Sequence, residues 1–242
     1  MANETSLIFI GGIKDSGKSD LAKRLGTGSG FKVARISDYF RDVLDGWPED
    51  KKDLTAAVVY MDWKKDEGRA IQKLCSDIPT WRTDQGISLK TLVINSHYAT
   101  YSPGGFMMGL DPESLRILCD KCNLFLPKSV GRVAVVLVDI GISDVLARRE
   151  RRWIHQTDDF PTGPGLAADL DFNRLYALQY YNCLAAMLGP QRVAYYRAVI
   201  DYKDMGDYKD ELSKTGAFDK TYGLLEKFLN AYLAPTSGSK HD

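Results

Sequence analysis

Long apolar runs are missing from this 242-residue sequence. No stretch approaches the roughly 18 residues that a membrane-spanning helix requires. The first ten residues, MANETSLIFI, also lack the basic start of a secretory signal. We therefore expect a protein without a membrane span that stays where it is made, in the cytoplasm.

An excess of charge of either sign is missing as well. Thirty-two Lys and Arg residues balance thirty-two Asp and Glu residues, so the whole chain has no electrostatic footprint for duplex DNA or anionic lipid. Some tyrosines, such as Tyr98 and Tyr180, have rings that stack on bases in other proteins, but thirteen tyrosines are more typical of core and rim. We expect neither a nucleic-acid partner nor a membrane partner.

Cysteine is scarce, with four residues: Cys75, Cys119, Cys122 and Cys183. Cys119 and Cys122 form a single CxxC, and no second Cys or His pair has suitable spacing for the four ligands of a zinc site. We expect plain thiols in a reducing compartment.

What is present is an ordinary globular composition, 44% hydrophobic and 26% charged, at a length suited to one α/β domain. Short apolar runs alternate with helical periodicity, which predicts a parallel sheet covered on both faces. The expected strands are 7–10, 31–37, 92–95, 131–141 and 192–200. The expected helices are 19–26, 38–47, 53–75, 112–123, 142–156, 170–188 and 222–233, and the expected loops include a polar one with Pro79 and Gly86, 98–110, 157–165 and a surface turn at the two DYKD tetrads.

A phosphate-binding motif lies between the first strand and the first helix. GIKDSGKS, Gly12 to Ser19, satisfies G-x-x-x-x-G-K-[ST] in full. In this motif the glycines let backbone N–H groups curl around the β-phosphate of a nucleotide, and the helix N-terminus adds partial positive charge. We expect Lys18 to bridge the β- and γ-phosphates of ATP and Ser19 to hold Mg²⁺. The expected ATP-binding residues are Gly12, Lys14, Asp15, Ser16, Gly17, Lys18 and Ser19.

Two points about this motif stay open. A Gly-rich turn with a solvated lysine is the alternative, and it explains the position of the motif less well. Asp15 places a carboxylate inside an anion-binding loop, where it either points outward or pairs with Lys14.

Three further segments resemble the nucleoside monophosphate kinases, in particular the archaeal-type adenylate kinases and their eukaryotic relatives. They are ISDYFR with Asp38 and Arg41, VINSHYATYSPGGFMMGL with His97, and VVLVDIGISDVLARRERR at 135–152. The resemblance covers about residues 5–233. It implies a P-loop kinase-like three-layer α/β sandwich with strand order 2-3-1-4-5. It also implies one domain at 1–233 with a lid at about 148–167, and the polar tail 234–242 is expected to be disordered.

The resemblance implies a lid whose arginines close over the phosphoryl group in transfer. Arg148, Arg151 and Arg152 share one helix face by spacing, whereas Arg149 points elsewhere. We expect Arg148, Arg149 and Arg152 to act on the phosphoryl group, because phosphoryl transfer needs positive charge and exclusion of water. A solvated basic helix end is the competing interpretation.

On the acceptor side, the arginine of the D-x-x-R spacing, Arg41, grips the acceptor's phosphate in the family. We expect Asp38, Arg41 and His97 to line this side. His97 either contacts the acceptor or forms a hydrogen bond within its own loop. Asp38 lies near the N-cap of the helix at 38–47 and is at least as well explained by a capping role. Such a cap stabilises a helix by about 1 kcal/mol.

The sequence departs from the family in two places. Asn95 stands where the family often has an Asp that organises Mg²⁺ and its waters, and Asn holds a metal less tightly. The lid segment after the arginines, WIHQTDDFPTGPG, has no second arginine group, so AMP as the acceptor is not assured.

We therefore expect ATP-dependent phosphoryl transfer to a small nucleotide-like acceptor, with a nucleoside monophosphate first. Two alternatives remain. One is a kinase of a hydroxyl acceptor, such as a nucleoside, modified nucleobase or metabolite, with Asp38 as the base. The other is a regulatory P-loop NTPase without a small-molecule acceptor. Mg²⁺ is the expected cofactor, and the sequence leaves the oligomeric state and protein partners open.

Overall fold

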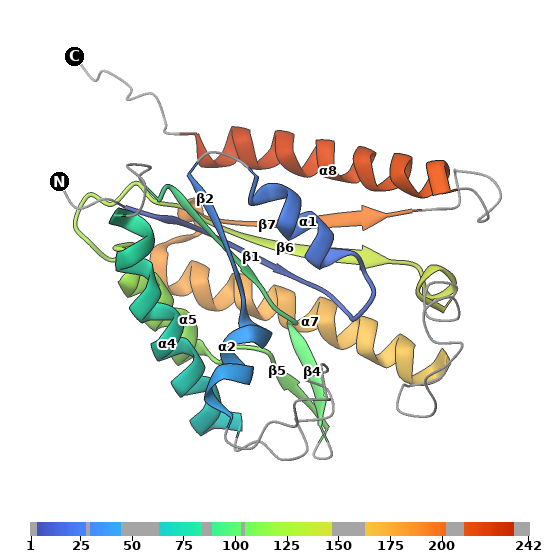
Figure 1. Cartoon of the computed structure of the whole chain (residues 1–242), viewed down its shortest axis with the longest axis horizontal. Helices are drawn as coiled ribbons and strands as arrows, with labels where there is room; N and C mark the ends of the chain where they lie inside the picture. Colours follow the sequence, from blue (N-terminus) through green and yellow to red (C-terminus); the bar gives the residue numbers. More distant parts are fainter. Residues whose placement is uncertain are drawn as a thin grey trace.

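A computed structural model of the chain describes residues 4–27, 30–44, 63–83, 89–102, 105–146, 163–201 and 211–234. Within these residues a sheet of five parallel strands lies between two layers of helices (Figure 1). The predicted α/β class with a five-stranded parallel sheet is thereby confirmed.

Helices and strands alternate along the chain, as the apolar pattern predicts. In chain order they are β1 Ser6–Gly11, α1 Lys18–Leu25, β2 Phe31–Arg35, α2 Ile36–Val43, α4 Trp63–Thr83, β3 Thr91–Asn95, β4 Ala99–Ser102, β5 Gly105–Met108, α5 Pro112–Lys121, β6 Val133–Ile140, α7 Gly163–Leu188, the 3-10 helix Pro190–Arg192, β7 Val193–Ile200 and α8 Glu211–Leu233. All five strands expected from the sequence are present.

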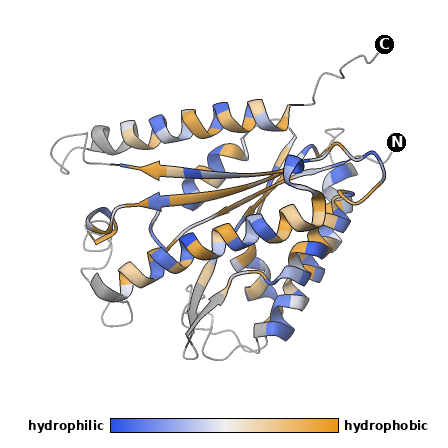
Figure 2. Ribbon diagram, turned by 180° about the vertical axis from the view of Figure 1, so that it is seen from behind, coloured by the Kyte–Doolittle hydropathy of each residue, from blue (hydrophilic) through white to orange (hydrophobic). Residues whose placement is uncertain are grey.

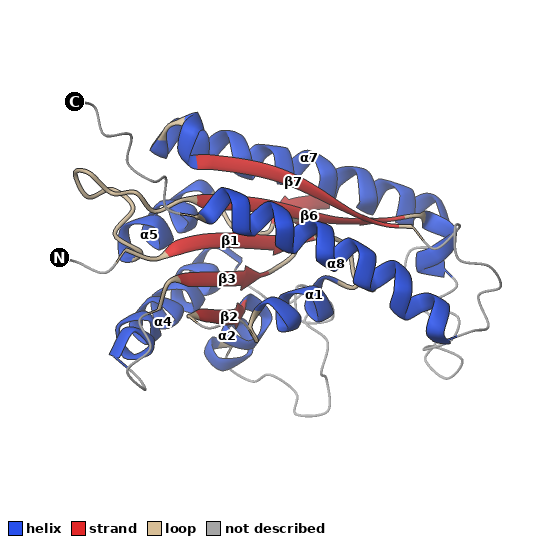
Figure 3. Ribbon diagram, turned by 90° about the horizontal axis from the view of Figure 1, so that it is seen from above, coloured by secondary structure: helices blue, strands red, loops and turns tan. Residues whose placement is uncertain are grey.

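The strands of the main sheet lie in the order β2-β3-β1-β6-β7, and Figure 3 shows them side by side. This is the order 2-3-1-4-5 that the resemblance implies. Arg35, Asn95 and Ile10 are register partners, so β2, β3 and β1 end nearly level. Gly11 pairs with Leu137, and β6 continues beyond Leu137 together with β7. The last residues of β6 and β7 therefore extend past the end of β1 and lie beside the segment that follows it.

Both faces of the sheet are buried, because alternate residues of each strand point to opposite sides. Leu7 and Phe9 of β1 pack in a cluster with α2, α4, α5 and α7. Ile8 and Ile10 pack in a second cluster with α1 and α8. Figure 2 shows largely apolar strands between helices that carry both apolar and polar residues.

The helix that contains Pro79 differs from the prediction. A polar loop was expected there, but α4 continues through Pro79 to Thr83. Pro79 itself is exposed, whereas Leu74 and Ile78 are fully buried in the core. Burial of this apolar face offsets the hydrogen bond that a proline inside a helix removes.

The segment 98–110 also differs from the predicted loop. It forms an antiparallel hairpin of β4 and β5, which projects beyond the main sheet (Figure 1). The N–H of Gly109 donates to the carbonyl oxygen of Tyr98 at 2.8 Å and closes the base of the hairpin. Main-chain pairing of this kind is invisible to side-chain periodicity, especially around the Pro-Gly pair at 103–104.

Several predictions fall partly or wholly outside the described residues. The lid arginines, the second DYKD tetrad and most of the tail lie there. The expected loop 157–165 overlaps α7, which already begins at Gly163. In the described part of the chain, no helix has the combination of length and apolarity that a membrane crossing needs.

The four cysteines are free thiols, and Cys75, Cys119 and Cys122 are buried. Burial raises the pKa of Cys75 to about 11 and the pKa of Cys119 to about 12. A thiol that stays protonated is a poor nucleophile and a poor metal ligand, so these residues act as small apolar core residues.

Candidate phosphate-binding site

The loop from Gly12 to Gly17 joins β1 to α1 and has an unusual backbone. Gly12, Asp15 and Gly17 have φ angles of 154°, 67° and 89°. Left-handed residues in a short loop can turn successive N–H groups toward one centre, which makes a nest for an anion. Gly17 is the N-cap of α1 and supplies no side-chain acceptor. The start of α1 is therefore not capped by the protein's own side chain at that position.

Close packing fixes the root of this loop. A Cβ on Gly12 would lie 2.4 Å from the carbonyl oxygen of Val138 in β6, and a Cβ on Gly11 would lie 2.7 Å from the ring of Tyr98. The hydroxyl of Tyr98 lies 2.8 Å from the carbonyl oxygen of Phe9 and 3.0 Å from that of Val136. The loop therefore begins in a place where only glycine fits.

Lys18, the lysine of the motif, is 8% exposed. Its Nζ donates to the carbonyl oxygen of Ile13 at 3.1 Å, so the side chain folds back over the loop. Burial lowers the pKa of Lys18 to about 8, while the carboxylates of Asp15 and Asp169 act in the opposite direction. The result is a desolvated cation at the loop, and its attraction for an anion is stronger there than in bulk water.

Ser19 lies beside Asn95, the residue that ends β3. The Nδ2 of Asn95 donates to the Oγ of Ser19 at 3.2 Å, and Asn95 is 6% exposed. Nearby, the buried Oγ of Ser16 has no hydrogen-bond partner within the described residues. A buried hydroxyl without a partner is costly, and a bound phosphate oxygen would satisfy it. Ser16 and Ser19 thus fit a site for a phosphate and its metal.

The described part of the chain contains no group of three or more His, Cys, Asp or Glu side chains that could hold a metal ion. A Mg²⁺ ion at Ser19 would therefore take most of its ligands from nucleotide and water, which is usual for this ion.

On the expected acceptor side, the structure brings Asp38 and Arg41 together. The Nη2 of Arg41 donates to the Oδ1 of Asp38 at 2.9 Å, and the Nε of Arg35 lies 3.9 Å from its Oδ2. The expectation that Asp38 is an N-cap is wrong. The helix begins at Ile36, two residues before Asp38, its N-cap is Arg35, and no side chain caps it by a hydrogen bond.

The structure places His97 two residues beyond Asn95, at the base of the β4–β5 hairpin. Its carbonyl oxygen accepts from the hydroxyl of Ser96 at 3.2 Å. A Cβ on Gly109 would lie 1.8 Å from the same oxygen, so the backbone of His97 and Gly109 is in close contact. Its part in acceptor binding stays a prediction.

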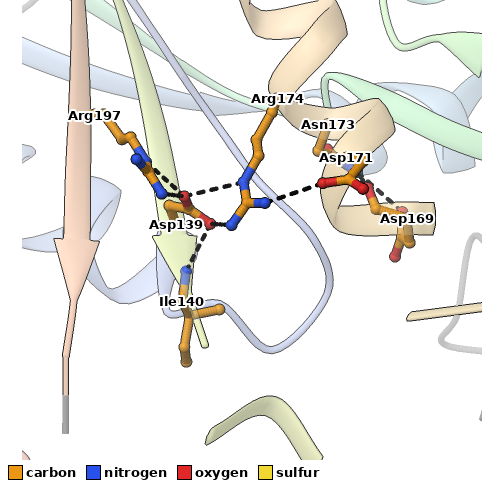
Figure 4. A network of polar contacts seen from close by, with 7 residues as sticks. All are labelled: Asp139, Ile140, Asp169, Asp171, Asn173, Arg174 and Arg197. Carbon is orange, nitrogen blue, oxygen red and sulfur yellow. Dashed lines mark hydrogen bonds and ion pairs between the residues drawn. The ribbon is translucent and has the colours of Figure 1, made fainter. Parts of the chain in front are cut away.

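Sequence reasoning missed several charged residues at this edge of the sheet. Arg35, at the end of β2, and Asp169, near the start of α7, both act on the charge of Lys18. Asn173 holds Asp169 through its Nδ2, which donates to the Oδ1 of Asp169 at 2.9 Å (Figure 4). These residues lie far from the motif in sequence, and no local pattern marks them.

A second missed feature is an ion-pair network around Asp139, the one charged residue in the apolar strand β6 (Figure 4). The side chain of Asp139 is 3% exposed. It accepts from the Nε and Nη2 of Arg174 at 3.1 Å each, from the Nε of Arg197 at 2.6 Å, and from the N–H of Ile140 at 3.1 Å. A lone Asp in such a strand was the available sequence signal.

Comparison with known proteins places the fold. No protein-family model matches this sequence, and no curated protein matches it. Among solved structures, a "putative kinase" from Chloroflexus aurantiacus superposes with a TM-score of 0.50 at 12% identity, covering 95% of this chain and 99% of that one. The two proteins share a fold, which in this chain is a five-stranded parallel sheet between layers of helices.

Two further structures are more distant, and their TM-scores of 0.42 are too low to add to the argument. One is a shikimate kinase from Bacteroides thetaiotaomicron, 12% identical over 91% of this chain and 98% of that chain. The other belongs to the Pnkp1/Rnl/Hen1 RNA repair complex, 14% identical over 74% of this chain. This chain spans 47% of that protein.

Proposed function

We propose that this chain is an ATP-dependent kinase of a small nucleotide-like acceptor, with a nucleoside monophosphate as the first candidate. The observation that carries the proposal is the loop Gly12–Ser19 between β1 and α1, with the buried cation of Lys18 folded over it. The fold shared with the kinase-like structure from Chloroflexus aurantiacus supports the same assignment.

The chemistry assigned to each group follows from phosphoryl transfer, in which the protein mainly positions the reactants and stabilises charge. The amides of the loop and the N-terminus of α1 would hold the β-phosphate, and Lys18 would reach the β- and γ-phosphates. Mg²⁺ bound with the Ser19 hydroxyl would neutralise phosphate charge. The lid arginines Arg148, Arg149 and Arg152 stay part of the proposal, although they lie outside the described residues.

A phosphate acceptor needs no base, because its oxygen is already nucleophilic. In that case Arg41 would bind the acceptor's phosphate, and Asp38 would orient Arg41 through the 2.9 Å contact. His97 and Arg35 would complete a basic acceptor side.

A hydroxyl acceptor is the second candidate, and one observation favours it. Asp38 is not needed to cap α2, and its side chain is 45% exposed. An exposed carboxylate at the end of β2 is therefore available to take a proton from an alcohol.

The test is ATP consumption with Mg²⁺ across a panel of acceptors, with products followed by ³¹P NMR. The panel contains the common nucleoside monophosphates, nucleosides and hydroxylated metabolites, and Lys18→Ala is the control for contaminating kinases. ADP together with a new diphosphate supports a monophosphate kinase and identifies its base. A new phosphate monoester supports the hydroxyl acceptor instead. Release of inorganic phosphate alone would contradict both and favour a regulatory NTPase.

A further inference from the structure

Asp15 is the one acidic residue inside the phosphate-binding loop. Its φ of 67° lies in the left-handed region, which glycine enters freely and which few other residues tolerate. Asp is among those few. The chain therefore has a carboxylate at a position where glycine would adopt the left-handed backbone conformation at a lower energetic cost and would carry no charge.

The side chain of Asp15 is directed toward the protein rather than into bulk solvent. Its Oδ2 atom is buried, and among all charged groups its carboxylate has the largest favourable interaction with the ammonium of Lys18. The buried Oδ2 contradicts the predicted arrangement in which Asp15 points outward, and its pairing with Lys14 stays a prediction. The carboxylate of Asp15 therefore acts electrostatically on the lysine that a nucleotide phosphate would need.

Lys18 has a second acidic neighbour, Asp169 of α7. Asp169 differs from Asp15 because Asn173 fixes it by two hydrogen bonds, to its carboxylate and to its carbonyl oxygen (Figure 4). Asp169 lies on a separate helix, α7, whereas Asp15 is part of the loop itself. A phosphate that enters the loop must come close to the charge of Asp15.

We propose that Asp15 is an internal competitor for Lys18 that weakens the binding of nucleotide phosphates and so sets the affinity for ATP and ADP. This inference rests on the proposed function, since it concerns the same loop. A carboxylate and a phosphate that share one partly desolvated loop repel each other strongly. Because ADP carries the same β-phosphate as ATP, the competitor also favours release of the product.

The experiment compares the wild-type chain with Asp15→Asn and Asp15→Gly. Asparagine keeps the size of the side chain and the tolerance for left-handed φ but removes the charge. Glycine removes both the charge and the backbone cost. Asp20→Asn is the matched control, because Asp20 is an exposed acidic residue in the first turn of α1. Binding of ADP, ATP and adenosine is measured by calorimetry slightly below neutral pH.

Both Asp15 variants are expected to bind ADP and ATP at least about tenfold more tightly, as the loss of one nearby negative charge implies. Adenosine, which has no phosphate, is expected to bind equally to all forms. The KM for ATP falls in both variants without an increase in kcat, whereas a purely structural role for Asp15 would worsen both parameters.

Equal or weaker binding of ADP by Asp15→Asn and Asp15→Gly would overturn this inference while leaving the proposed function intact. An equal gain in Asp20→Asn would also overturn it, because the effect would then come from net charge. If neither the wild type nor the variants bind ADP or ATP, both the inference and the proposed function fail.

Discussion

The carboxyl edge of the sheet has two halves that treat charge differently. Over β6 and β7, Asp139 is 3% exposed and is held by Arg174, Arg197 and a backbone N–H. Over β2, the carboxylate of Asp38 is 45% exposed and has one close arginine partner, Arg41 at 2.9 Å. Both residues are aspartates near strand ends, but they differ in exposure to solvent and in the number of donors that hold the carboxylate.

The difference separates a structural carboxylate from one available for chemistry. All the strong acceptor positions of Asp139 are occupied by fixed donors, so it joins α7 and β7 to the end of β6. Asp38, by contrast, is partly exposed to solvent at the same edge of the sheet. The following variants test this contrast, and the expected effects decrease from the first to the last.

Lys18→Ala is expected to have the largest effect. ATP consumption falls by about a thousandfold, because a desolvated cation at the transferring phosphate is lost. Folding is retained, since the removal of a buried ammonium also removes a desolvation cost. A coupled assay of ADP formation measures the activity, and a thermal melt checks the fold. Retained turnover would contradict the assignment of the loop as the nucleotide site.

Asp38→Asn tests the available carboxylate. If the acceptor is a hydroxyl, kcat falls by about a hundredfold or more, because the proton acceptor is lost. If the acceptor is a phosphate, kcat changes little and the KM for the acceptor rises, because Arg41 loses its orienting partner. The two outcomes are separated by steady-state kinetics at saturating ATP. Arg41→Ala is the companion variant, which should raise the KM for a phosphate acceptor.

Asp139→Asn tests the structural carboxylate. The free energy of unfolding is expected to fall by about 2 kcal/mol, because charge-assisted hydrogen bonds to two arginines are weakened. The arginines are half exposed and can return to water, which keeps the loss below that of a fully buried pair. Denaturant titration measures the change. Asp171→Asn is the control, because this exposed partner of Arg174 should contribute less than about 0.5 kcal/mol.

Asn95→Asp has the smallest expected effect. A carboxylate beside Ser19 strengthens the hold on Mg²⁺, so the Mg²⁺ concentration for half-maximal activity falls about threefold to tenfold. The titration is made at saturating ATP, and ATP binding without metal serves as the control. An unchanged Mg²⁺ requirement would show that Asn95 acts only through its hydrogen bond to Ser19.

The extent of sequence-based prediction differs between elements for physical reasons. The buried strand β6 was predictable because a run of β-branched residues has few other stable environments. The hairpin β4–β5 was not, because its pairing is made by main-chain atoms of two short segments rather than by a side-chain pattern. The helix through Pro79 was not predictable, because a local pattern shows only the hydrogen bond that proline removes. The burial of Leu74 and Ile78, which offsets that loss, depends on the tertiary structure.

The candidate site divides in the same way. The motif Gly12–Ser19 was visible in the sequence because a phosphate nest requires consecutive residues of defined type. The counter-ions of Lys18 were only partly visible: Asp15 lies in the motif, but Asp169 lies on α7. The role of Asp38 was misjudged by local capping rules, because α2 begins two residues earlier than the polar pattern indicates.

The sequence by itself determined the fold class, the five strands and the position of the motif Gly12–Ser19 between a strand and a helix, because each depends on residues that are neighbours along the chain. Only the tertiary structure decided which charges surround that loop. Parallel strands bring their carboxyl ends to one edge of the sheet, so Asn95, Asp139 and the loop before Lys18 lie at that edge through topology. Electrostatic interaction depends on distance in space and on burial, and the order of residues along the chain gives neither quantity.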